Sequence, residues 1–159
     1  MSKTHELEST LEELLRRDES TEQRIDRCVQ AIAEGFEASS CTFHQANDSG
    51  ELLSLRSQVG IPDQLLPIIG KIPFGKGMAG ICAERREAVT VCNLQTDASG
   101  VARPAAKETG VAGALVVPVL GESGQVQATL GVGKDGDYDY SDEEIDLLSR
   151  CAAALAREL

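Results

Sequence analysis

The two ends of the chain carry apolar residues that recur every three or four positions, which is the spacing of one helix face. Near the N-terminus these residues are Leu7, Leu11, Leu14, Leu15, Ile25, Cys28, Val29, Ile32 and Phe36. The polar stretch 17–23 interrupts the pattern, and within it Ser20 and Gln23 have the spacing of a capping box. We therefore favour a short leading helix and a second helix that begins near residue 20 over one long helix.

The C-terminal segment is predicted to be a capped helix. Residues 141–144 read Ser-Asp-Glu-Glu, which fits the S-x-x-E capping box. The apolar face of the helix that follows consists of Ile145, Leu147, Leu148, Cys151, Ala152, Leu155 and Ala156. This face is broad enough to cover part of a hydrophobic core.

Between these helices the pattern changes to the alternating or continuous apolar runs that are typical of strands. Strands are predicted at 40–44, 52–57, 89–94, 114–120 and 126–132, with turns at 47–50 and 121–124, short helices at 62–69 and 78–86, and a long loop at 95–110. Helices at both ends and strands between them predict an α+β fold. In this fold an antiparallel sheet has the terminal helices on one face.

Composition narrows the possible functions. With 159 residues and 42% hydrophobic content, the chain is long enough for one domain with a substantial core. Its formal charge of −11 gives it no overall attraction for nucleic-acid phosphates or anionic membranes. No apolar run reaches the ~20 residues of a membrane helix, and the N-terminus lacks the layout of a secretory signal. We therefore expect a cytoplasmic protein with neither nucleic acid nor membrane as a partner.

The cysteines and histidines do not predict a metal or a cofactor. The five cysteines are Cys28, Cys41, Cys82, Cys92 and Cys151. Their number is odd and no C-x-x-C pair is present, which favours free thiols in a reducing compartment. The two histidines, His5 and His44, form no recognised zinc or Cys-His catalytic spacing with them.

Four aspartates, at positions 135, 137, 139 and 146, have the spacing of a calcium-binding loop. The sixth position of such a loop is normally glycine, and here it is Tyr140. We therefore interpret the acidic residues as charges that favour the N-terminus of the last helix.

Residues 75–80 read Gly-Lys-Gly-Met-Ala-Gly, which matches the G-x-G-x-x-G motif of dinucleotide-binding sites. The preceding segment, 71–74, is short and contains a proline, so it is unlike the buried parallel strand that such sites require. We therefore predict that the glycines allow a tight turn and a close backbone approach where a helix begins.

Several segments together resemble the GAF domain family. They are Ile-Pro-Phe-Gly-Lys-Gly-Met-Ala-Gly at 72–80, Ala-Val-Thr-Val at 88–91, Leu-Val-Val-Pro-Val at 115–119, Leu-Gly-Val at 130–132 and the helix start at 139–144. The resemblance covers roughly residues 20–159, which leaves 1–19 as an N-terminal helical extension. It implies a PAS-like antiparallel sheet, with terminal helices on one face and a small-molecule pocket under short helices and loops on the other.

The resemblance also implies candidate functions. Most GAF domains are sensors or dimerising regulatory modules, so we expect a non-catalytic, ligand-binding homodimer that acts in signal transduction, alone or with a signalling partner protein. A free methionine-(R)-sulfoxide reductase would carry cysteines near Ala79 and in the loop near 101–104, and both are absent. Such an enzyme would need Cys82 and Cys92 to act from shifted positions. A pure protein-interaction domain is a third possibility.

Two other ligand classes that GAF domains bind require sequence motifs that this chain lacks. Bilin-binding GAF domains use a Cys-His pair, and cyclic-nucleotide-binding ones carry an Asn-Lys…Phe…Asp-Glu signature, neither of which is found here.

The expected pocket residues are chosen by strand face and loop position. They are Phe43, Met78, Cys82, Asn93, Asp97, Arg103 and Thr129. Around them, between residues 71 and 110, basic side chains outnumber acidic ones, although the chain as a whole is acidic. A small anionic ligand that meets Arg103 or Lys107 is therefore the leading chemical hypothesis.

Overall fold

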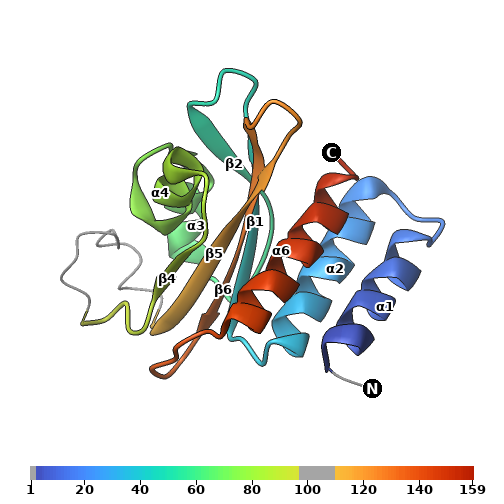
Figure 1. The fold of residues 1–159 in the computed structure, drawn as a ribbon, viewed down its shortest axis with the longest axis horizontal. Coiled ribbons are helices and arrows are strands. Elements are labelled where there is room, and N and C mark those ends of the chain that lie inside the picture. The colour runs from blue at the N-terminus through green and yellow to red at the C-terminus, as the bar shows by residue number, and fades with distance from the viewer. Residues whose placement is uncertain (1–2, 97–109) are drawn as a thin grey trace.

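A six-stranded antiparallel sheet with helices on both faces forms the frame of the protein, as seen in a computed structural model that describes residues 3–96 and 110–159 (Figure 1). The strands lie in the order β3-β2-β1-β6-β5-β4. Their bounds are β1 Ser40–Ala46, β2 Leu52–Val59, β3 Lys71–Pro73, β4 Val89–Val91, β5 Gly113–Leu120 and β6 Val126–Lys134. The helices are α1 Lys3–Leu15, α2 Thr21–Gly35, α3 Leu66–Ile69, α4 Gly77–Arg85 and α6 Asp142–Ala156, with a 3₁₀ turn at Asp63–Leu65. This arrangement confirms the α+β prediction.

Capping boxes start the two long helices that cover one face of the sheet. At α2 the Ser20 hydroxyl accepts a hydrogen bond from the backbone N–H of Gln23, whose side chain accepts one from the Ser20 N–H. Ser141 and Glu144 form the same reciprocal pair at α6. Each box satisfies N–H groups that have no partner inside the helix, so both helices begin where the sequence predicted.

The main core lies between the sheet and these helices. In Figure 1, α2 and α6 lie side by side against the sheet, and α1 packs beyond them. Leu7 and Leu11 of α1 are buried in this core together with Phe43 of β1, Leu130 of β6 and Leu148 of α6. The apolar faces predicted for the terminal helices are therefore largely buried within the chain itself.

Two strands differ from the sequence prediction. β3 was not expected, because residues 71–74 contain a proline; it lies at the sheet edge, where Pro73, its last residue, is tolerated. The strand expected at 89–94 ends at Val91. Just beyond it, the Asn93 side-chain oxygen accepts a hydrogen bond from the Gln95 N–H and forms a turn, while the Leu94 N–H still donates to the carbonyl oxygen of Ala112 next to β5.

The glycine motif forms the connection between β3 and α4. Gly75 has a φ of +88°, a left-handed conformation that glycine adopts without strain. Gly80 lies against the backbone of β3, and every strand pair in the described sheet is antiparallel. The prediction of a tight turn and a close approach is therefore confirmed, and the segment lacks the parallel-strand context of a dinucleotide site.

Candidate functional site

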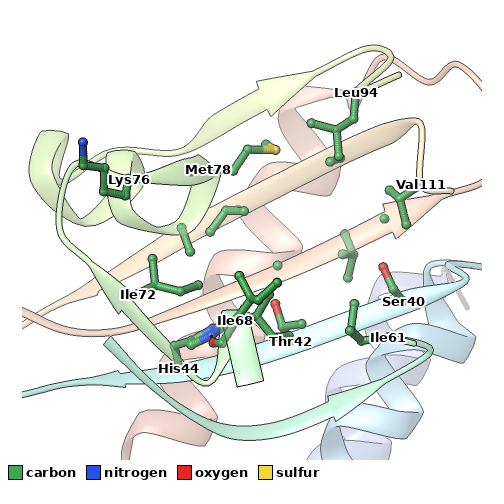
Figure 2. A pocket seen from close by; sticks show the side chains of 18 residues that line it. Ser40, Thr42, His44, Ile61, Ile68, Ile72, Lys76, Met78, Leu94 and Val111 are labelled. Atoms are coloured by element: carbon green, nitrogen blue, oxygen red, sulfur yellow. Dashed lines mark hydrogen bonds between the residues drawn. The ribbon is translucent and has the colours of Figure 1, made fainter. Parts of the chain in front are cut away.

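The face of the sheet opposite α2 and α6 holds a cavity of about 150 Å³ (Figure 2). Its floor is formed by β1, β5 and β6, and its walls by α3, the first turn of α4 and the residues that flank them. Gly131 and Gly133 of β6 carry no side chain that would fill it, and they let Val116 and Val111 lie close to the strand. The described lining includes the buried residues Leu94 and Val111, which lie on either side of residues 97–109 in the sequence.

Most of the cavity lining is apolar. The larger apolar side chains are Ile61, Ile68, Ile69, Ile72, Met78, Leu94, Val111 and Val116. Among the described lining residues, the uncharged polar side chains of Ser40 and Thr42 and the imidazole of His44 come from alternate positions of one strand, β1, and face the cavity. Lys76 is the one charged side chain among the described lining residues, and it is exposed at the rim. An apolar enclosure with a few polar groups is typical of small-molecule sites.

His44 is the most deeply buried polar group of this lining, with 2% of its surface exposed. Its Nε2 lies 2.8 Å from the carbonyl oxygen of Ile69 in α3. A carbonyl oxygen can only accept a hydrogen bond, so Nε2 carries the proton and Nδ1 is left as an acceptor. Burial lowers the pKa of His44, although the bond to Ile69 opposes this shift, and the ring is neutral at pH 7.

The Nδ1 atom of His44 has no hydrogen-bond partner among residues 3–96 and 110–159. The same is true of the Oγ1 atom of Thr129, which is 1% exposed. His44 and Thr129 are directly opposite each other in the antiparallel pair of β1 and β6, so their side chains lie on the same face of the sheet. Two adjacent buried polar groups thus lack partners within the described protein.

The structure brings together only some of the expected pocket residues. Met78 lines the cavity. Thr129 is on the correct face but is not part of the lining. Asn93 lies away from the cavity, where its amide donates to the Asp137 carboxylate. Asp97 and Arg103, together with Lys107, lie outside the described residues.

Two further expectations need correction. Phe43 does not line the cavity, because residues alternate along β1 and Phe43 points into the core beneath the helices. Cys82 does not line the cavity either; it is fully buried one turn beyond Met78 in α4, where its thiol lies 3.7 Å from the Val116 carbonyl oxygen. The residues that sequence reasoning missed are Ser40, Thr42, His44 and Lys76. The alternation of polar and apolar residues over 40–44 was the signal that could have identified the first three.

The two cysteines considered for reductase chemistry are poor nucleophiles in this structure. Burial raises the pKa of the Cys82 thiol to about 12. Cys92 is exposed, but partial desolvation and the neighbouring Asp139 carboxylate raise its pKa as well. Thiol chemistry requires the thiolate, and the raised pKa values keep both cysteines in the less reactive thiol form at neutral pH.

The described residues form neither a metal-binding cluster nor a membrane-spanning helix. Within 3–96 and 110–159, no group of three or more His, Cys, Asp or Glu side chains is arranged to hold a metal ion. None of the described helices combines the length and the apolar character needed to cross a bilayer.

Comparisons with known proteins agree with the fold. The sequence profile of the GAF domain matches residues 18–159. No curated protein matches the chain. The chain is similar in structure to the GAF domain of a phosphoenolpyruvate-protein phosphotransferase from Coxiella burnetii, with a TM-score of 0.80, 20% identity and coverage of 98% of this chain and 91% of that one.

Two further structures represent different functions. Free methionine-R-sulfoxide reductase from Neisseria meningitidis has a TM-score of 0.73 and 18% identity, over 98% of this chain and 84% of that one. A putative GAF sensor protein from Burkholderia vietnamiensis has a TM-score of 0.75 and 17% identity, over 99% of this chain and 93% of that one. At these identities, the likeness supports a shared fold and does not choose between an enzyme and a sensor.

Proposed function

The chain belongs to the GAF domain family, and from this premise we propose that it is a small-molecule-binding sensor or regulatory module of cytosolic signal transduction, not an enzyme. The observation that carries the proposal is the cavity under α3 and α4, with its apolar lining and its few polar groups on β1. The raised pKa values of Cys82 and Cys92 favour binding over thiol catalysis.

The proposed ligand is small, with an apolar body, and a negative charge on it would face the rim of the cavity. Lys76 is exposed there, immediately before the first turn of α4, and no side chain caps the helix N-terminus. A carboxylate or phosphate at this position would be attracted by the lysine and by the helix dipole. Arg103 and Lys107 remain candidates for the same anionic group.

A thermal-shift panel of small carboxylates, nucleotides and neutral aromatic compounds tests this function. We expect at least one class to raise the melting temperature of the wild-type protein. The Ala114→Met variant places a larger side chain in the cavity and should abolish that response. Ser123→Met, in the exposed turn between β5 and β6, is the matched control and should keep it.

Two results would contradict the proposal. One is that no compound stabilises the wild-type protein. The other is that Ala114→Met responds as the wild type does, because the ligand would then bind elsewhere.

A further inference from the structure

His44, which lines the cavity, and Thr129, which lies opposite it on the neighbouring strand, carry information about the ligand that binds there. Both side chains are at least 98% buried, and each holds a polar atom with no partner among the described residues. An unpaired buried polar group costs roughly 1–3 kcal/mol, so native proteins rarely leave one unsatisfied. Two such atoms on opposing residues of neighbouring strands indicate that a further molecule completes this site.

The chemistry of His44 determines what that molecule must offer. The Ile69 carbonyl oxygen takes the Nε2 proton, and burial keeps the ring neutral. The free atom, Nδ1, can therefore only accept a hydrogen bond. The missing partner must supply an N–H or an O–H group.

The surroundings of His44 exclude most charged donors. The described lining contains no Asp or Glu, so an ammonium group next to His44 would be buried without a counter-charge. The neighbouring side chains of Ile68, Ile69 and Ile72 are apolar and suit the body of a compact ligand. A neutral donor on an apolar framework fits these constraints.

Building on the proposed function, we propose that the ligand carries a neutral N–H or O–H group on a compact aromatic or branched apolar body and donates a hydrogen bond from it to His44 Nδ1. The hydroxyl of Thr129, which lies opposite His44 but outside the cavity lining, then bonds to a water next to the donor. A ligand that also has an anionic group would direct it toward Lys76 at the rim. His44 is thus the specificity-determining residue of the cavity.

Indole and benzofuran test this assignment, because they have nearly the same shape and only indole has an N–H. In the empty protein a water can satisfy Nδ1, and benzofuran would displace it without replacing its hydrogen bond. We expect indole to bind the wild-type protein about threefold to tenfold more tightly than benzofuran, measured by NMR titration. The ¹⁵N resonance of His44 Nδ1 should shift with indole and shift much less with benzofuran.

The His44→Leu variant removes both ring nitrogens, so the side chain has no acceptor for the ligand. Glutamine is not suitable here, because its amide would keep an acceptor beside the nitrogen that donates to the Ile69 carbonyl. We expect His44→Leu to bind the two compounds equally. His5→Leu is the matched control, because residue 5 belongs to α1 on the other face of the sheet, and it should keep the preference for indole.

The outcomes separate this inference from the proposed function. Equal binding of both compounds to the wild-type protein, or an unchanged preference in His44→Leu, overturns the role of His44 and leaves the cavity as a ligand site. Binding of neither compound overturns the inferred ligand class, and the thermal-shift panel then decides whether any ligand binds. If His44→Leu does not fold, the wild-type preference and the Nδ1 resonance still decide the question.

Discussion

Gly80 of α4 approaches the carbonyl oxygen of Pro73 in β3 so closely that a β-carbon at position 80 would lie 2.4 Å from it. No side chain can be accommodated at that distance without a backbone shift. The contact holds the first half of α4 against the edge strand, and α4 forms one wall of the cavity. The third glycine of the motif therefore has a packing role that can be measured.

Gly80→Ala is expected to lower the free energy of unfolding by about 1–3 kcal/mol, the usual cost of overpacking. Gly136→Ala is the control, because nothing lies within 4 Å of a β-carbon built there, and it should change stability by less than about 0.5 kcal/mol. Urea denaturation followed by circular dichroism measures both. Equal stability of the two variants would show that α4 can move away from β3 at little cost.

The stability of the protein should depend on pH through His44. Burial lowers the pKa of His44 below the value of 6.5 that applies in the unfolded chain. As the pH falls below about 6.5, the unfolded state binds a proton that the folded state does not, so stability decreases, by at most about 1.4 kcal/mol per pH unit for one proton.

Urea denaturation at several pH values between 7.5 and 5.5 measures this effect. This range is chosen because it lies above the pH at which most carboxylates titrate. His44→Gln should show a smaller loss of stability over this range than the wild type. A loss in His44→Gln as large as that of the wild type would assign the pH dependence to other groups.

One thiol should react in the folded protein. All five cysteines lie in the described residues, and only Cys92 is exposed. A disulfide-exchange reagent should modify one equivalent at pH 8, more slowly than a free model thiol because the pKa of Cys92 is raised. Unfolding should make the four buried thiols reactive as well. Cys92→Ser should abolish the reaction of the folded protein.

The same thiols predict an absence of reductase activity. Free methionine sulfoxide and a thiol reductant should give no turnover with the wild-type protein. Turnover that disappears in Cys82→Ser or Cys92→Ser would contradict this prediction and would favour the enzyme interpretation.

The proposed homodimer depends on surfaces that α1 leaves uncovered. A groove between α1 and α6 has apolar lining from Leu11, Leu15, Ala153, Ala154 and Leu159. We predict that light scattering at tens of micromolar gives twice the 16.9 kDa mass of one chain, and that Ala153→Glu reduces it to one chain. Gln64→Glu, in the exposed 3₁₀ turn before α3 and outside the groove, should stay dimeric. A monomer mass for the wild type would contradict the prediction.

The fold could be predicted from the sequence because its main signals are local. Capping boxes at Ser20 and Ser141 determine where helices begin, and the spacing of apolar residues determines which helix face is buried. The glycine motif at 75–80 could be assigned to a tight turn because the segment before it, 71–74, is too short to be the buried parallel strand of a dinucleotide site. Each of these conclusions depends on residues within a few positions of one another.

The site was harder to predict because it depends on which face of each strand is used. Along β1, Cys41 and Phe43 point to the helices while Thr42 and His44 point to the cavity. Choosing the aromatic residue as a ligand contact was therefore an error of one position, and such an error reverses every side chain on a strand. The roles of the two nitrogens of His44 depend on Ile69, a partner 25 residues away, so they could not be inferred from local pattern.

A single layer of backbone separates the cavity from the helices. In β6, Gly131 and Gly133 form part of the cavity floor, while Leu130 and Val132 belong to the core that α2 and α6 cover. If ligand binding displaces this central strand, the side chains of Leu130 and Val132 move with it and change the packing of α2 and α6 directly, because no loop or hinge lies between them. Substitutions under α6 that never touch the ligand should change its affinity, and the ligand should change helix packing by the same coupling free energy.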